Sequence, residues 1–317
     1  MNKKILSLAV AAVVAAPFAA PITAQAADVS VNGAYSMAMF NTDEDLSVTT
    51  GIGTGSGKAG GGLYGGDFGI SKVEFNVKSG DAFAKIATSI VSNTGGLCVT
   101  GSCVREVMAG VKVGGVDVIL GRQANMYNNG VKVDTMTGTF MEARKHPGGV
   151  AKVPSFVGGL LGVSGKAGEV SYGVQYGPEY SDSYSQTNPI YAHVNFKAGP
   201  AAIGIGYQGD PAGNATTGAS AKMKFGDVAV AVSLESADGA YVGGGTTGTA
   251  SSIVFADVSM PLGGGTVGLG LGNNTDQSST FARLSYQMKV GGGADFFAGV
   301  AKDDSNQRVG AGLTVKF

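Results

Sequence analysis

The end of the chain alternates strictly between apolar and other residues. Between residues 308 and 317, the apolar positions are Val309, Ala311, Leu313, Val315 and Phe317. Successive side chains of a β-strand point to opposite faces, so this pattern predicts a strand with one apolar and one polar face. The same alternation recurs over residues 73–78, 192–197 and 282–290, and it predicts further strands of this kind.

Alternating segments of about ten residues are joined in turn by very short and much longer connections, which is typical of a membrane barrel. In lipid every backbone N–H and C=O group must be paired, so only a closed sheet can cross. We therefore predict an all-β fold, a 16-stranded antiparallel transmembrane β-barrel whose interior is wide enough for an aqueous channel. Tight turns are expected at Ser79–Asp81, Gly114–Gly115, Lys166–Gly168, Gly199–Pro200, Gly226–Asp227, Pro261–Gly265 and Gly291–Gly293.

Residues 1–26 have the organisation of a secretory signal peptide. A short basic start precedes a long apolar run, and Ala24-Gln25-Ala26 fits a small-x-small cleavage site. A membrane-anchoring helix would need about 20 uninterrupted apolar residues, whereas Pro17 and Pro21 break this run. Export from the cytoplasm is therefore expected.

Cleavage would leave residues 27–317 as one barrel domain and, through the loss of Lys3 and Lys4, change the formal net charge from −1 to −3. The chain has 54 glycines and only 14% charged residues, a composition adverse to helices and unusual for a soluble domain. It has no Trp, so the aromatic girdles of a barrel would come from Tyr and Phe. Candidates are Phe40, Phe68, Tyr207, Phe225 and Phe317.

A secreted soluble β protein, either a sandwich or a solenoid, is the main alternative fold. It would show similar alternation and similar glycine-rich turns. A soluble sandwich, however, has no need of strictly alternating short and long connections or of an aromatic final residue. These two features favour the barrel.

Three segments resemble the general diffusion porins of the Gram-negative outer membrane. Ser71–Asp81 is similar to the second strand and first turn of that family, Leu120–Gln123 to the end of its fifth strand, and Leu313–Phe317 to its terminal strand. The family's usual Asn-Ser-apolar-x-Tyr segment is replaced here by Pro154–Gly158. The resemblance spans the mature chain in layout, and the chain is identified as a divergent member.

This resemblance implies an infolded third loop, here residues 124–153, that faces basic side chains on the barrel wall across a narrow constriction. The implied constriction residues are the wall bases Lys72 and Arg122, the loop acids Asp134 and Glu142, and the loop bases Arg144 and Lys145. It also implies a homotrimer in contact with outer-membrane lipid and lipopolysaccharide. The implied signal for the barrel-assembly machinery is Leu313, Val315 and Phe317.

Arg122 conflicts with strict alternation, which would place it on the lipid face together with Leu120. An arginine near the membrane midplane costs about 2–4 kcal/mol. A bulge near Gly121 that turns Arg122 toward the lumen is therefore favoured over an Arg122 that reaches the rim. Other lumen-wall candidates by alternation are Glu74, Lys85, Glu106, Lys112, Lys222, Lys224 and Arg283.

Cys98 and Cys103 lie in one predicted outer loop, and an oxidising compartment favours a disulfide between them. Their spacing is off the usual metal pattern and no His is near, so no metal site is predicted. The stretch 51–59 resembles a phosphate loop but lacks Ser or Thr after Lys58. No cofactor and no nucleic-acid partner is expected.

The two histidines, His146 and His193, show no spacing to a Ser or Asp that would mark a catalytic pair, so an enzyme is not predicted. The favoured function is a water-filled channel for ions and small hydrophilic solutes across the outer membrane. The alternative is a structural or surface-recognition barrel with little or incidental conduction. The sequence leaves open whether the channel prefers anions or cations.

Overall fold

The computed structural model describes residues 27–42, 46–50, 72–89, 104–131, 135, 156–178, 188–209, 215–237, 251–275, 279–303 and 306–317. Within these ranges no helix is long and apolar enough to cross a membrane. The predicted signal peptide lies outside them, as do Cys98 and Cys103.

The described chain is almost entirely strand, with one short helix. The strands up to the helix are β1 (Asp28–Thr42), β2 (Leu46–Thr50), β3 (Lys72–Ser79), β4 (Ala82–Ser89), β5 (Val104–Val113) and β6 (Val116–Ala124). The helix is α2 (Tyr127–Val131). After it come β7 (Phe156–Ala167), β8 (Val170–Tyr176), β9 (Ile190–Ala198), β10 (Ala201–Gly209), β11 (Ala215–Phe225), β12 (Val228–Ala237), β13 (Ser251–Leu262), β14 (Gly265–Asn274), β15 (Ser279–Gly291), β16 (Ala294–Asp303) and β17 (Asn306–Lys316).

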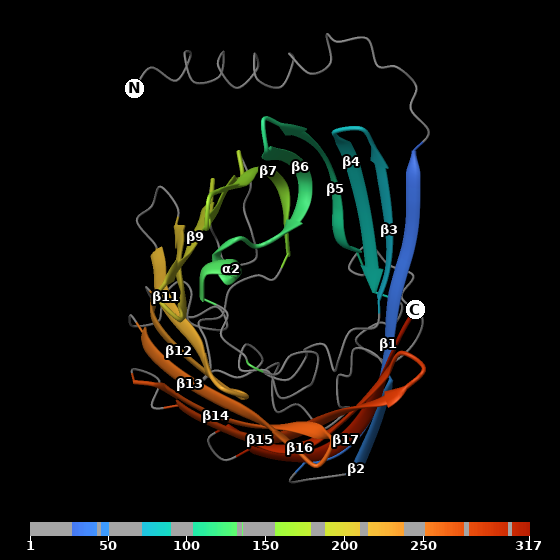
Figure 1. Cartoon of the computed structure of the whole chain (residues 1–317), viewed down its shortest axis with the longest axis vertical. Coiled ribbons are helices and arrows are strands. Elements are labelled where there is room, and N and C mark those ends of the chain that lie inside the picture. Colours follow the sequence, from blue (N-terminus) through green and yellow to red (C-terminus); the bar gives the residue numbers. More distant parts are fainter. Residues whose placement is uncertain are drawn as a thin grey trace.

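The strands form one closed antiparallel ring (Figure 1). Each pairs with its chain neighbour, and the ring closes because β1 pairs with both β17 and β3. The β1 residues Asp28–Ala34 pair with β3, and the next part of β1, Met37–Asn41, pairs with β2. β2 therefore continues the position of β3, and the barrel is 16-stranded as predicted.

The short hairpin turns occur where the sequence predicts them. At the turn between β5 and β6, Gly114 and Gly115 have φ values of +56° and +86°. Two successive residues with positive φ are the signature of a type I′ turn, whose twist matches that of the two strands. Other residues pay a steric cost in this conformation, and for this reason a glycine pair predicts the turn.

The two faces of the barrel differ as the alternation predicts. On β14, Leu269 and Leu271 are 49% and 54% exposed, and Gly268 and Gly270, which alternate with them, are buried. On β15, Leu284 is exposed and Arg283 is buried. Apolar side chains thus lie on the outside of the ring, and polar side chains face the inside, which is the reverse of a soluble core.

The seam between the first and last strands is covered by the terminal aromatic residue. The N–H of Gly33 donates to the carbonyl of Phe317 at 2.7 Å, and the N–H of Phe317 donates back at 3.0 Å. A Cβ at Gly33 would lie 2.4 Å from the Phe317 ring, so the ring lies directly over this glycine. Phe317, Phe225 and Tyr207 are exposed on the outer face, as the girdle prediction requires. The side chains of the other two girdle candidates, Phe40 and Phe68, lie outside the described part.

Replacing Phe317 by alanine is expected to weaken the seam. A cross-strand aromatic contact contributes up to about 1 kcal/mol, so the temperature at which the barrel unfolds, followed by electrophoretic mobility after heating, should fall. Phe225→Ala is the matched control, because Phe225 is equally exposed at 61% against 64% but lies in a hairpin inside the sheet. If the unfolding temperature fell equally in both variants, this would contradict a role of Phe317 in closing the ring.

Candidate pore constriction

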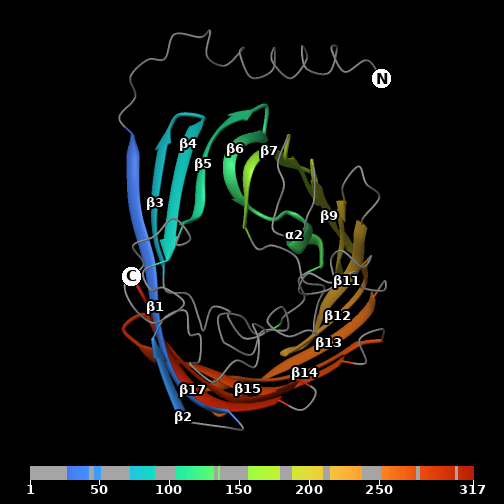
Figure 2. The ribbon, with the colours of Figure 1, turned by 180° about the vertical axis from the view of Figure 1, so that it is seen from behind.

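After β6 the chain turns into the ring, and α2 lies against the inner face of the opposite wall. Figures 1 and 2 both show α2 inside the ring, next to β9 and β11. It contacts β9, β10, β11 and β12. Met126, Tyr127 and Val131 are buried in this contact. The segment belongs to the third long connection, the one predicted to fold inward.

Glycines on the wall allow the helix to approach the backbone of the sheet. A Cβ at Gly204 would lie 2.1 Å from the carbonyl oxygen of Gly130 in α2, and a Cβ at Gly206 would lie 2.8 Å from that of Tyr127. Gly218 on β11 is also in direct contact, because its Cβ would lie 3.0 Å from the Tyr127 hydroxyl. No side chain larger than hydrogen fits at Gly204 without a shift of the helix or strand.

Amide and hydroxyl side chains of the wall anchor the inward segment. Gln175 on β8 accepts the N–H of Met126 at 2.9 Å and donates to the carbonyl of Ala124 at 2.8 Å. The Ser220 hydroxyl on β11 donates to the carbonyl of Gly130 at 2.7 Å. These groups satisfy backbone polar atoms that a buried loop would otherwise leave unpaired.

Tyr127 connects the helix to a buried carboxylate. Its hydroxyl donates to Glu235 of β12 at 2.5 Å. Burial, together with the negative charge of Glu235, raises the pKa of Tyr127 well above its usual value of 10.0. The hydroxyl therefore stays protonated and remains a donor over the physiological pH range.

A second anchor joins the loop to a buried ion pair. The N–H and hydroxyl of Thr135 both donate to Oδ2 of Asp257 on β13, at 2.6 and 2.7 Å. The same oxygen accepts Nη2 of Arg283 on β15 at 2.5 Å, and both charged side chains are 0% exposed. Arg283 is thus on the inner wall, where alternation predicts it, but it is engaged in holding the loop.

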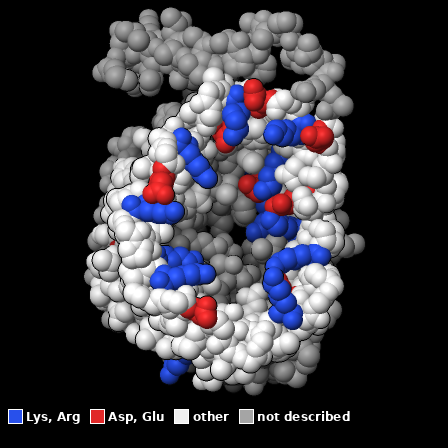
Figure 3. Space-filling view, in the orientation of Figure 1, with Lys and Arg blue, Asp and Glu red and all other residues white. Residues whose placement is uncertain are grey.

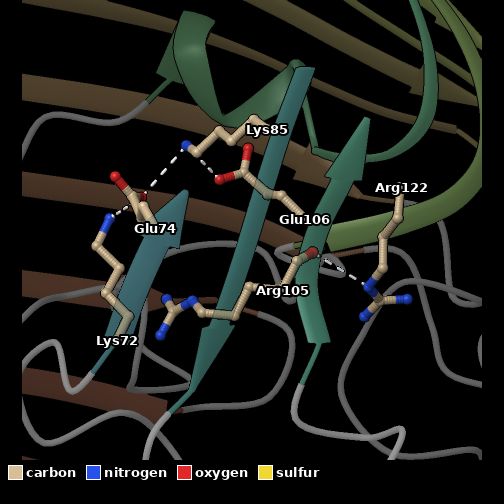
Figure 4. Close-up of polar contacts among 6 residues, drawn as sticks. All are labelled: Lys72, Glu74, Lys85, Arg105, Glu106 and Arg122. Atoms are coloured by element: carbon tan, nitrogen blue, oxygen red, sulfur yellow. Dashed lines mark hydrogen bonds and ion pairs between the residues drawn. The ribbon is translucent and has the colours of Figure 1, made fainter. Parts of the chain in front are cut away.

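On β3, β4 and β5 a row of alternating charges lines the wall. Lys72 and Lys85 both pair with Glu74, and the Lys85–Glu74 distance is 3.3 Å. Lys85 also pairs with Glu106 at 2.6 Å. Figure 4 shows Lys85 between the two carboxylates, with Arg105 and Arg122 on the same part of the wall. The structure therefore brings together Lys72, Glu74, Lys85 and Glu106 from three strands.

Arg105 was missed by alternation because β5 contains an irregularity. Ala87 pairs with Glu106 and Thr88 pairs with Val104, so Arg105 is the extra residue of a bulge. A bulge changes the direction of side chains without any change in the apolar pattern. The Nη1 atom of Arg105 is buried. In the sequence, the only feature that could have pointed to Arg105 was its position next to the predicted lumen-facing Glu106.

The pairing of β6 with β7 is irregular near Gly121, as predicted, but Arg122 still pairs in register with Val107, which is 45% exposed on the outer face. The irregularity therefore does not by itself reverse the phase of Arg122. Gly121 pairs with Leu160, and Gln123 pairs with Val157, so β7 carries the extra residue; Gly121 itself has a φ of +119°. Arg122 is half-buried. Its Nε donates to the carbonyls of Val104 and Arg105 at 3.0 and 3.1 Å, at the bulge of β5.

The remaining predicted site residues are dispersed or fall outside the described part. Lys112 is at the short-turn end, 3.2 Å from Asp117. The loop residues Asp134, Glu142, Arg144 and Lys145 lie outside the described residues. Figure 3 shows Lys, Arg, Asp and Glu around the rim of the opening and on its inner wall. In the described part of the chain, no three His, Cys, Asp or Glu residues come together as a metal site.

Glu235, Asp257 and Thr135 also went unrecognised in the sequence. Ile253 and Phe255 share a face of β13 with Asp257, and all three are buried. Apolar residues on the inward-facing positions of a wide barrel indicate that something covers that wall. This pattern could have pointed to the docking area of the loop.

Comparison with known proteins agrees with this architecture. The family model described as Gram-negative porin matches residues 8–308. No curated protein matches the sequence. Among solved structures, a loop L8 deletion mutant of OmpT from Vibrio cholerae aligns with a TM-score of 0.65 at 13% identity, over 92% of this chain and 100% of that one. An anion-selective porin from Comamonas acidovorans aligns with a TM-score of 0.63 at 13% identity, over 92% of this chain and 100% of that one. Salmonella typhi OmpF in complex with daunomycin aligns with a TM-score of 0.66 at 11% identity, over 91% of this chain and 97% of that one.

A closed 16-stranded barrel with an apolar outside, a charged inner wall and an infolded loop defines an outer-membrane channel. The chain belongs to the Gram-negative porin family. It is located in the outer membrane and forms a channel for passive diffusion. Family and fold point to a non-enzymatic channel.

Proposed function

We propose that the channel filters solutes at a constriction between the infolded loop and the charged row on β3, β4 and β5. The observation that carries this proposal is the anchoring of the loop across the opposite wall, from Gln175 on β8 to Asp257 on β13. A loop held at several points narrows the lumen permanently. Its width sets the size limit for small hydrophilic solutes and ions.

The charges at this level act on the solute that passes. Lys72, Glu74, Lys85 and Glu106 alternate in sign along the wall, so they attract and orient polar solutes. An apolar solute would have to displace the water ordered around these charges. Asp134 directly precedes the anchored Thr135 in the sequence. We propose Asp134, together with Glu142, Arg144 and Lys145, as the charges of the loop side, and Arg122 as a further wall base.

The functional unit is proposed to be a homotrimer in outer-membrane lipid and lipopolysaccharide. Residues 1–26 would direct export, and Leu313, Val315 and Phe317 would be recognised by the barrel-assembly machinery. The support is the family membership together with the exposed positions of these three residues on the terminal strand. A single band at monomer size in non-denaturing electrophoresis of folded protein would contradict the trimer.

The test is single-channel recording of the refolded, detergent-purified protein in a planar bilayer. A water-filled pore is expected to give large current steps that increase with salt concentration and close in threes. Heat-denatured protein at the same concentration is the control. Folded barrels that give no steps would favour a structural or surface-recognition barrel instead.

A further inference from the structure

A short apolar strip lies on the inner wall of β4, β5 and β6. It consists of Phe83, Met108 and Ile119, which have the same phase on their strands as the lumen-facing charges Lys85, Glu106 and Asp117. Because side chains alternate between the two faces of a strand, the strip faces the lumen. The residues of opposite phase on these strands are exposed on the outer face: Ile86, Val107 and Leu120.

A glycine lets the aromatic ring of the strip lie flat on the wall. Gly110 pairs with Phe83 on one side and with Ile119 on the other. A Cβ at Gly110 would lie 2.5 Å from Cζ of the Phe83 ring, so the ring lies across this glycine. Phe83 and Met108 are half-buried, so part of each side chain is accessible to a solute. Covering such an apolar surface is favourable in water.

Ion pairs flank the strip on both sides along the channel. Toward the constriction, Lys85 is 2.6 Å from Glu106, and toward the short turns, Lys112 is 3.2 Å from Asp117. All four charged side chains are partly accessible, from 12% for Glu106 to 52% for Lys112. The edge of the strip on β3 has a third couple of opposite charges, Lys78 and Asp28, which face each other in the sheet.

We infer that this strip is a weak binding site for zwitterionic solutes with an apolar side chain, which are apolar amino acids and short peptides. The inference rests on the proposed function of the barrel as a channel. The side chain of such a solute would cover the strip, while its ammonium and carboxylate groups would meet the two signs of charge beside it. A solute with one charge is attracted by one member of each ion pair and repelled by the other. Binding of this strength delays a solute and still lets it leave the channel.

The test is the interruption of single-channel current by free amino acids. L-methionine and L-glutamine are both zwitterions of similar size, and only the side chain of methionine ends in an apolar group. Methionine is expected to interrupt the current in a saturable way, and glutamine at the same concentration should interrupt it less. Methionine amide, a cation, and N-acetylmethionine, an anion, should also interrupt it less than methionine does.

Substitutions in the strip assign the effect. In F83A/M108A the methionine concentration for half-maximal interruption should rise at least about threefold. F83L/M108L, which retains the apolar surface, should resemble the wild type. I86A is the matched control, because Ile86 follows Lys85 on β4 but is 51% exposed on the outer face. If F83A/M108A does not fold, M108Q keeps the length of the side chain and should weaken the interruption in the same direction.

The outcomes separate this inference from the proposed function. Folded protein without current steps overturns the channel and the binding site with it. Normal steps on which methionine and glutamine act alike overturn only the binding site. A stronger effect of methionine amide or N-acetylmethionine overturns the preference for zwitterions. An unchanged methionine effect in F83A/M108A or M108Q, or an equal loss in I86A, overturns the assignment to the strip.

Discussion

Replacement of Asp257 by alanine is expected to lower the free energy of unfolding by about 3–5 kcal/mol. Arg283, which is fully buried, would lose its carboxylate partner, and the loss of a buried counter-charge is far more costly than the loss of an exposed ion pair. Thr135 would lose its acceptor at the same time. Urea unfolding of the folded barrel, followed by circular dichroism, measures this loss.

A double variant separates the ion pair from the anchor. In D257L/R283M both charges of this pair are removed, so most of the free energy of unfolding should return. Thr135 would still lack its acceptor, so single-channel currents of D257A and of the double variant should both fluctuate more than those of the wild type. Wild-type currents in the double variant would show that Asp257 does not hold the loop.

An exposed pair serves as the control for Asp257. Lys197 and Glu169 are 3.4 Å apart and 65% and 71% exposed. Exposed pairs contribute about 0–1 kcal/mol, so K197Q should unfold like the wild type. If K197Q lowered the free energy of unfolding as much as D257A does, burial would not be the reason why the Asp257 substitution is costly.

Replacement of Gly204 by alanine is expected to move α2 away from the wall and to reduce single-channel conductance. The new Cβ would lie 2.1 Å from the carbonyl oxygen of Gly130, so the helix backbone must shift toward the lumen. Overpacking of this kind typically costs about 1–3 kcal/mol. Both measurements are made on the same preparation: single-channel recording gives the change in conductance, and urea unfolding gives the loss of stability.

Gly165→Ala is the matched control, with the same chemical change in another strand. Its Cβ would meet only the hydroxyl end of Tyr172, at 2.8 Å, and that side chain can move aside. Conductance should therefore remain that of the wild type. If Gly204→Ala leaves the current unchanged in a folded barrel, α2 does not define the width of the channel.

Local features of the barrel were predictable because each depends on neighbours in the sequence. The alternation around Leu269 and Leu271 decides which face meets lipid, since a strand offers two faces only. The pair Gly114-Gly115 marks a hairpin because few residues adopt two successive positive φ angles. The predicted strands and turns follow from these two rules, and so does the inward position of Arg283.

Features that join distant segments were not predictable in the same way. Arg105 lies in a bulge, and one extra residue changes its direction without altering the apolar pattern. Asp257 reads as an ordinary polar residue of β13 until Thr135, 122 residues away, is found beside it. The glycines under α2 look like the many other glycines of the chain.

The sequence by itself thus determined the barrel, its apolar outside and its infolded third loop, through periodicity, turn chemistry and family resemblance. Only the tertiary structure decided how that loop is held and which acids are neutralised. The physical reason is that strand direction repeats every two residues, whereas ion pairs and close backbone contacts depend on distances across the lumen that no local pattern encodes.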